Sequence, residues 1–207
     1  MKKDQDYISD IAEIRSMMER SSKFLSLSGW AGIMAGIYSL AGAYVAYRIM
    51  GADPGDVSTT YANVNISSKI PQLIALAAIV LILAVGTAVY FSGKRAGKRS
   101  EKLWNPTSKR LLTAMAVPLV AGGILILILL ANGIVGLAAP LTLIFYGLAL
   151  YGAGKFTYPE IKSLGIIEIC LGLIGAYFIG YGLIIWALGF GVFHIAYGIY
   201  MHFKYER

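Results

Sequence analysis

The sequence contains few of the residues that build disulfides, metal centres and most catalytic sites. Its 207 residues include one cysteine, Cys170, and two histidines, His194 and His202. A lone cysteine forms no intrachain disulfide, so we expect Cys170 to be a buried, unreactive thiol. The two histidines would lie about 12 Å apart along one helix, which does not suit paired haem ligation, and there is no cysteine pair or HExxH run. We therefore predict no metal, no cofactor and no enzymatic activity.

Charge is also scarce, and apolar residues are abundant. Charged residues make up 14% of the chain, against about 25% in soluble domains, while 57% are hydrophobic and the mean hydropathy is +0.68. Six apolar segments are long enough to cross a bilayer core of about 30 Å, and they must be helical to satisfy their backbone groups there. These segments cover residues 24–47, 71–92, 111–131, 134–154, 163–180 and 183–203.

The predicted fold is an all-α integral membrane bundle of six transmembrane helices in three hairpins. The connection at Asn132–Gly133 is so short that the third and fourth helices should be antiparallel neighbours. Pro118 and Pro140 are expected to interrupt these two helices, because proline removes a backbone hydrogen bond. We expect the transmembrane domain to cover residues 24–203, followed by a short cytoplasmic tail at 204–207.

The basic residues predict the orientation of the chain. Lys and Arg collect in the short loops on the cytoplasmic side of a membrane. With the N-terminus inside, all of the eighteen basic residues except Arg48 and Lys69 fall in cytoplasmic segments. Both termini should therefore be cytoplasmic, and the net charge of +7 reflects topology rather than nucleic-acid binding.

Residues 1–23 are predicted to form a cytoplasmic amphipathic helix. Apolar residues recur at helical spacing from Tyr7 to Met18, and balanced charges occupy the other side. Such a helix lies in the bilayer interface or, alternatively, docks a partner or dimerises. The basic loop Gly93–Arg110 is expected to attract anionic lipid. The predicted partners are the lipid bilayer, a second copy of the chain and a cytoplasmic protein, with no nucleic acid.

Two ionisable residues, Glu168 and His194, lie inside the last two apolar segments. A charged group at membrane depth costs about 2.5–3.5 kcal/mol on insertion scales, so each needs a partner or a function. On antiparallel helices joined at Gly180–Gly182, Glu168 would lie roughly 9 Å and His194 roughly 15 Å from the cytoplasmic ends of their segments. This difference of about one helical turn permits a direct or water-bridged contact.

Small residues share the helix faces of both groups, which indicates close helix packing rather than exposure to lipid. The predicted helix-packing glycines are Gly32, Gly36, Gly172, Gly175, Gly191 and Gly198. The pair in the first segment is expected to pack within the chain rather than in a dimer. Tyr197, three residues beyond His194, is a candidate to line the same interior. Most other tyrosines, including Tyr146, are expected at the membrane interfaces.

The run Leu164–Ile169, followed by Gly172–Ile174, Trp186–Gly191, His194 and Tyr197–Gly198, resembles small bacterial multi-pass membrane proteins of an uncharacterised family. The similarity extends over most of the chain, including residues 15–36. It implies a bacterial cytoplasmic (inner) membrane and supplies no activity.

Two functions fit these residues. In the first, the chain is a small proton-linked transporter or channel in which Glu168, His194 and Tyr197 line a pathway, because a buried carboxyl and imidazole can exchange a proton near neutral pH. In the second, it is a non-transporting membrane module that binds a protein or lipid, and the pair fixes the register of two glycine-lined helices. We favour the first, because an intramembrane ionisable residue is by default a functional one.

Overall fold

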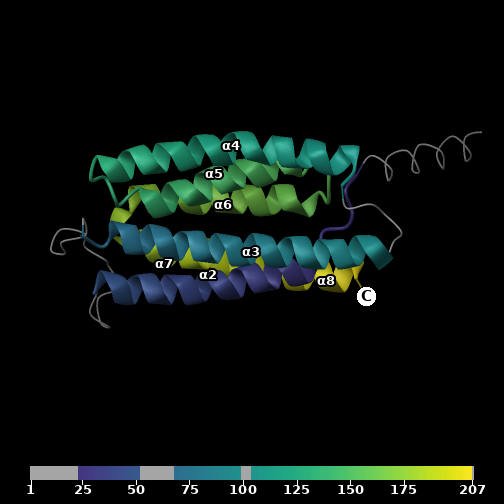
Figure 1. The fold of residues 1–207 in the computed structure, drawn as a ribbon, viewed down its shortest axis with the longest axis horizontal. Coiled ribbons are helices and arrows are strands. Elements are labelled where there is room, and N and C mark those ends of the chain that lie inside the picture. The colour runs from purple at the N-terminus through teal and green to yellow at the C-terminus, as the bar shows by residue number, and fades with distance from the viewer. Residues whose placement is uncertain (1–22, 52–67, 99–103, 207) are drawn as a thin grey trace, which may run out of the picture.

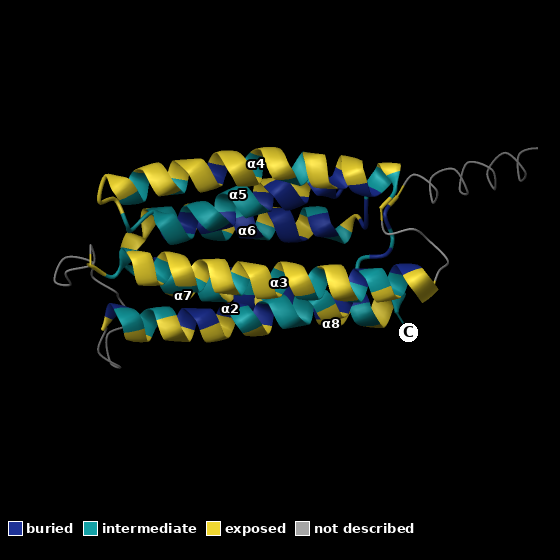
Figure 2. Cartoon of the chain, in the orientation of Figure 1, coloured by how far each residue is buried: buried dark blue, intermediate teal, exposed yellow. Residues whose placement is uncertain are grey.

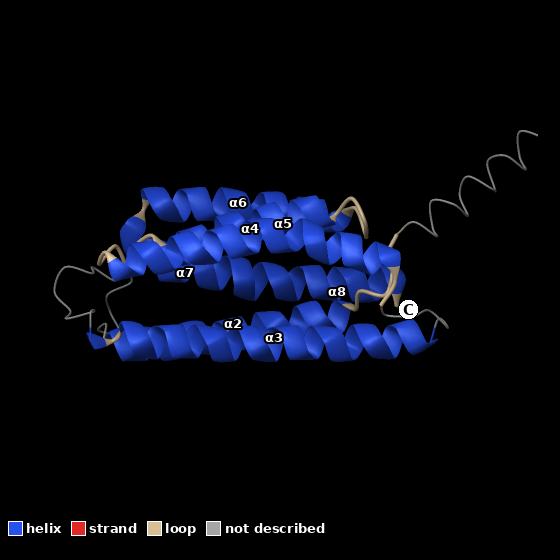
Figure 3. Ribbon diagram, turned by 45° about the horizontal axis from the view of Figure 1, so that its top comes forward, coloured by secondary structure: helices blue, strands red, loops and turns tan. Residues whose placement is uncertain are grey.

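The computed structural model describes residues 23–51, 68–98 and 104–206, and these residues form an all-helical bundle without strands (Figures 1 and 3). This confirms that the described part of the chain is all-α, as predicted. The elements are α2 (Gly29–Met50), α3 (Ile70–Lys98), α4 (Pro106–Ala131), α5 (Ala138–Ala153), α6 (Glu160–Tyr177), η2 (Ile179–Tyr181), α7 (Gly182–Trp186), η3 (Ala187–Phe193) and α8 (His194–Tyr205). The predicted amphipathic helix at 1–23 lies almost entirely outside the described residues.

Four of the described helical stretches are long and apolar enough to cross a membrane. They are Gly29–Met50, Ile70–Lys98, Pro106–Ala131 and the run Ile179–Tyr205 from η2 to α8. Helix α5 is apolar but shorter, at 16 residues. Helix α6 carries three charged residues among its 18, namely Glu160, Lys162 and Glu168, and is not one of the four candidate spans.

The first and last helices of the described chain are neighbours. Helix α2 packs against α3 on one side and against α8 and η3 on the other, while α5 packs between α4 and α6. Figure 3 shows α2 and α3 in one layer and α4, α5 and α6 in another, with α7 and α8 between them. The α2/α3 and α4/α5 hairpins are present, whereas α6 meets the following chain mainly through α7 and η3. The last helical run therefore joins the two layers.

The outer helices present apolar side chains to the surroundings. In α3 the buried residues are Ser92 and Ala96, and in α4 they are Ser108, Leu111 and Gly122. Figure 2 shows both helices exposed along most of their outward faces. Surface of this kind is normal against lipid and unusual against water, where large exposed apolar patches are rare.

The chain before α2 is extended rather than helical, so the first helix begins five residues later than expected. The Phe24 amide donates to the Phe156 carbonyl at 2.7 Å, and the Phe24 carbonyl accepts from the Thr157 hydroxyl at 2.7 Å. The Tyr158 hydroxyl donates to the Leu25 carbonyl, also at 2.7 Å. These bonds satisfy the backbone without a helix, and the connection from α5 to α6 supplies most of them.

The prolines do not interrupt the helices, so that expectation was wrong. Pro140 is the third residue of α5, and the first turn tolerates proline because its amide needs no partner there. Pro118 lies inside α4, which continues unbroken from Pro106 to Ala131. Pro140 is fully buried instead, against the glycines of α6.

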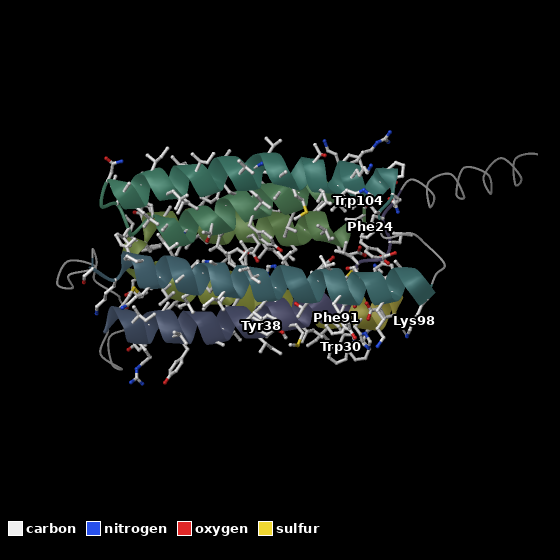
Figure 4. The ribbon with its side chains drawn as sticks, viewed as in Figure 1. Phe24, Trp30, Tyr38, Phe91, Lys98 and Trp104 are labelled. Atoms are coloured by element: carbon white, nitrogen blue, oxygen red, sulfur yellow. The ribbon has the colours of Figure 1, made fainter. Side chains whose placement is uncertain are left out.

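Most basic residues of the described helices lie at or beside the helix ends on the side of the bundle that holds the C-terminus. Here α3 and α8 end and α2, α4 and α6 begin. Figure 4 shows Phe24, Lys98 and Trp104 toward this end. The basic residues at or beside these helix ends are Lys23, Lys94, Arg95, Lys98, Lys109, Arg110, Lys155, Lys162 and Lys204. Arg48 and Lys69 lie at the opposite end.

Candidate functional site

Glu168 lies in the middle of the buried face of α6. The buried residues of this helix recur at spacings of three and four and form one stripe: Ile161, Leu164, Gly165, Glu168, Gly172 and Gly175. Glu168 is 0% exposed, and neither carboxylate oxygen has a hydrogen-bond partner among the described residues. An ionised carboxylate in an apolar interior without hydrogen bonds carries a large desolvation cost. A carboxyl group at this position therefore needs a neighbouring charge or a function, as the sequence predicts.

His194 faces this carboxyl group from the start of α8 and is 5% exposed. Its Nδ1 lies 3.3 Å from Glu168 Oε1 and 3.0 Å from the Gly189 carbonyl oxygen. Because a carbonyl can only accept, a hydrogen on Nδ1 is donated to Gly189. The approach to Glu168 is thus an electrostatic contact rather than a directed hydrogen bond.

The second ring nitrogen of His194 contacts Tyr146, a residue that the sequence analysis expected at a membrane interface. Nε2 lies 3.0 Å from the Tyr146 hydroxyl on α5. The hydroxyl donates to Nε2 when the imidazole is neutral and accepts from it when the imidazole is charged. His194 therefore has hydrogen-bond partners in both protonation states, which a pair that exchanges protons requires.

A π-helical segment shapes this site. Residues Ala187–Phe193 form the wider π-helical turn, a departure from α-helix that is frequent at functional sites. A Cβ atom at Gly189 would lie 2.5 Å from Glu168 Oε2 and 2.6 Å from Leu143 Cδ2. Glycine is needed here because the backbone of the π-helical segment passes directly against the carboxyl group. The same residue supplies the carbonyl that holds His194.

Aromatic rings pack around His194. The His194 ring stacks on Phe190 with centroids 5.6 Å apart and lies 5.4 Å from the Tyr146 ring. Trp186 packs on Phe190 and donates from Nε1 to the Thr142 hydroxyl at 3.0 Å. These rings keep water away from one side of His194 and limit its rotation.

Tyr146 could have been found in the sequence, and Tyr197 does not take the position predicted for it. Tyr146 lies three residues after Leu143 and four before Leu150, both of which are buried. That spacing places it on the inward face of α5. Tyr197 packs on the cluster of Leu150, Ile161 and Leu164, and its buried hydroxyl has no hydrogen-bond partner among the residues that the structure describes. It makes no hydrogen bond with Glu168 or His194.

The predicted packing glycines all lie at close helix contacts. The glycines of α6 and those of the last helical run pack on different helices. A Cβ at Gly198 would lie 2.6 Å from the Gly29 carbonyl oxygen, and one at Gly36 would lie 2.7 Å from that of Gly191. The glycines of α8 and η3 therefore face α2, together with Gly32. Atoms of Pro140 approach Gly172 and Gly175, so the glycines of α6 face α5.

A second polar cluster closes the bundle at the end where the C-terminus lies. The Arg95 guanidinium contacts Glu206 Oε1 at 2.6 Å and donates to the carbonyls of Leu27 and Tyr205 and to the Tyr158 hydroxyl. Glu206 also accepts from the Gly29 amide at 2.7 Å and contacts His202 Nδ1 at 2.7 Å. We call Arg95, Glu206 and His202 the terminal clamp, because they join the chain before α2, the end of α3 and the end of α8.

Burial acts to raise the pKa of the Glu206 carboxyl, but the bonds from His202 and the Gly29 amide and the charge of Arg95 outweigh it. The pKa of Glu206 therefore lies below its usual range. Close by, Glu160 Oε1 accepts from Lys204 Nζ and from the Tyr205 hydroxyl. Burial opposes ionisation of this carboxyl too, but these bonds dominate and lower the pKa of Glu160.

Among the described residues, no group of three or more His, Cys, Asp and Glu side chains could hold a metal ion. Cys170 is exposed, so the expectation of a buried thiol was wrong. It lies on the outer face of α6, two residues beyond Glu168, where helical geometry turns a side chain away from the buried stripe.

Comparison of the chain with protein-family models, with curated proteins and with solved structures finds no significant match.

Proposed function

We propose that this chain is an integral membrane protein that crosses a bacterial cytoplasmic membrane six times, with both termini in the cytoplasm. The six apolar segments each contain a described helix or helical run, and basic residues gather at the end of the bundle that holds the C-terminus. Membership of the uncharacterised family that the sequence resembles is part of this proposal. Helix α6 would cross the bilayer with its buried face, which carries Glu168, turned toward the other helices.

The function that the site supports best is proton-linked transport or conduction, with Glu168 and His194 as the proton-binding pair. The observation that carries this proposal is the complete burial of Glu168 without a hydrogen bond, 3.3 Å from His194. With Glu168 ionised and His194 neutral, the pair carries one uncompensated negative charge. One added proton, on either residue, removes that net charge, which an apolar interior strongly favours.

Loading and release of this proton would change the contacts of the π-helical segment. An ionised Glu168 repels the Gly189 carbonyl oxygen, whereas a protonated one can donate to an acceptor. Tyr146 rotates its hydroxyl to follow the charge of His194. Protonation therefore alters the packing between α6 and η3, and η3 belongs to the last helical run, which joins the two layers of the bundle. A proton-dependent change at this joint is what coupling to a solute or a gate requires.

The second candidate is a non-transporting membrane module that binds a protein or lipid. The observation in its favour is that both ring nitrogens of His194 have partners and that glycines pack the helices closely around it. In that case the pair fixes the register of α6 and the last helical run, as buried polar groups do in some proteins.

Flux into liposomes separates the two functions. Purified full-length protein, Glu168→Gln and His194→Ala are reconstituted and challenged with proton and solute gradients, and thermal stability is measured for each. We expect flux in the wild type and its loss in Glu168→Gln at nearly unchanged stability, because glutamine fills the same space without binding a proton. Tyr151→Phe, on the exposed face of α5, is the matched control.

Absence of flux under every gradient, with both variants less stable than the wild type, would establish the structural role instead. The search for function would then move to partners of the cytoplasmic surface.

A further inference from the structure

Within the described part of the chain, two more buried oxygens without hydrogen-bond partners lie between the Glu168–His194 pair and the end of the bundle that holds the C-terminus. They are the Tyr197 hydroxyl and Glu160 Oε2. The other Glu160 oxygen is occupied by Lys204 and Tyr205. Buried polar atoms without a partner are uncommon in proteins and each needs an explanation.

The helix register sets the order of these groups. Glu160 contacts Lys204 and Tyr205 at the helix ends, and Glu168 contacts His194, so α6 and the last helical run are antiparallel and in register between these points. Tyr197 lies three residues from His194, about 4.5 Å along the axis toward Lys204. It therefore lies between the pair and Glu160.

A shared hydrophobic cluster links the two tyrosines. Tyr146 and Tyr197 both pack on the cluster of Leu150, Ile161 and Leu164. The Tyr197 hydroxyl is within electrostatic range of Glu160 and of Tyr146, with Tyr158 and Tyr205 as its other titratable neighbours. Tyr146 in turn contacts His194. The groups thus form a series from Glu160 through Tyr197 and Tyr146 to His194 and Glu168.

We propose that Tyr197 and Glu160 form the proton route between the Glu168–His194 pair and the aqueous side where the C-terminus lies. The Glu160 carboxyl group, whose side chain is 17% exposed at the helix ends, takes a proton from water there and passes it on from its buried Oε2. The proton passes through bridging water to the Tyr197 hydroxyl, which accepts it on a lone pair and releases its own, and then through Tyr146 to His194. Each step moves one proton and leaves the relay group unchanged. This inference rests on the proposed proton-binding function of the pair.

The alternative is that Tyr197 serves only to fill space. Removing a buried hydroxyl that has no partner costs little or even stabilises a protein. Tyr197→Phe should therefore fold and melt like the wild type whether or not the route exists, so a kinetic effect cannot be ascribed to misfolding.

The test is an acid pH jump on the purified full-length protein, with the infrared bands of the Glu168 carboxyl followed in time. The bands are assigned by their loss in Glu168→Gln. We expect Tyr197→Phe and Glu160→Gln to slow the response by about tenfold or more, since each removes one proton relay. Tyr177→Phe, which is 81% exposed at the far end of α6, should respond like the wild type.

Each outcome decides a different part of the proposal. A response that is as fast in Tyr197→Phe and Glu160→Gln as in the wild type overturns the route and leaves the proposed function standing. No response of the Glu168 bands to pH in the wild type overturns both. Slowed responses without flux in liposomes support the route and count against transport.

Discussion

At the scale of single residues, Gly189 determines whether the Glu168 carboxyl group has room. Its Cβ position lies within 2.6 Å of both Glu168 and Leu143, and these side chains are themselves fully buried. We predict that Gly189→Ala lowers the free energy of unfolding by about 1–3 kcal/mol through overpacking. Gly123→Ala on α4, where no atom lies within 4 Å, is the control and should be neutral or slightly stabilising. Thermal unfolding in detergent measures both.

The cause of this loss can be tested with a double variant. Glu168→Ala removes the carboxyl group with which the added methyl group of Gly189→Ala would clash. The double variant should therefore lose less stability than the sum of the two single variants, with a coupling energy of about 0.5–2 kcal/mol. Additive losses would show that Leu143, rather than Glu168, requires the glycine.

The sequence predicted the pair but not its full surroundings. Glu168 and His194 stood out because each is ionisable within an apolar segment, and counting residues placed them within one turn of each other. Tyr146 was missed because tyrosines are common at membrane interfaces. Its helical spacing from Leu143 and Leu150, which are buried on α5, was the signal that pointed to the interior. Tyr197 was predicted from its distance along the helix, but Tyr146 on α5 contacts the imidazole instead.

At the scale of helices, the contact between α2 and α8 depends on glycines whose neighbours are backbone atoms. A Cβ at Gly198 would lie 2.6 Å from both the Gly29 carbonyl oxygen and the Ile33 amide nitrogen. Backbone cannot move aside as a flexible side chain can. We predict that Gly198→Ala destabilises the protein by at least about 1–3 kcal/mol, measured as a lowered unfolding midpoint.

Gly86→Ala on α3 is the matched control, because no atom lies within 4 Å of its Cβ position. Equal midpoints for the two variants would contradict a close contact between α2 and α8.

The periodicity of the sequence located the helices but not their partners. Apolar length predicted the six segments, and each contains a described helix or helical run. A glycine stripe shows that a helix packs closely and does not show against which neighbour, so the pairing of α2 with α8 was not foreseeable from one sequence. The extended chain at 23–28 was also missed, because its hydrogen bonds come from residues more than sixty positions away.

At the scale of the whole molecule, the terminal clamp joins the two ends of the described chain. Arg95 and Glu206 are 10% and 12% exposed, so removal of one leaves the other poorly solvated. We predict that Arg95→Ala costs up to about 3 kcal/mol, since loss of one member of a buried ion pair is strongly destabilising. Lys98→Ala, near the end of the same helix, should change stability little. Chemical or thermal unfolding of both variants in detergent provides the comparison.

The clamp also makes stability depend on acid pH in a defined direction. Hydrogen bonds and the charge of Arg95 outweigh burial and lower the folded-state pKa of Glu206 below its usual value of 4.5. A carboxyl with a lowered pKa stabilises the fold above its unfolded-state pKa, and this contribution is lost as pH falls through the folded-state pKa. We therefore predict an unfolding midpoint that falls on acidification below about pH 4.5.

The unfolding midpoint of Glu206→Gln should be lower at neutral pH and should fall less steeply with acidification. Glu160, whose pKa is also lowered, leaves a residual slope that Glu160→Gln should remove. Parallel pH profiles for the wild type and Glu206→Gln would show that the clamp carboxyl does not contribute.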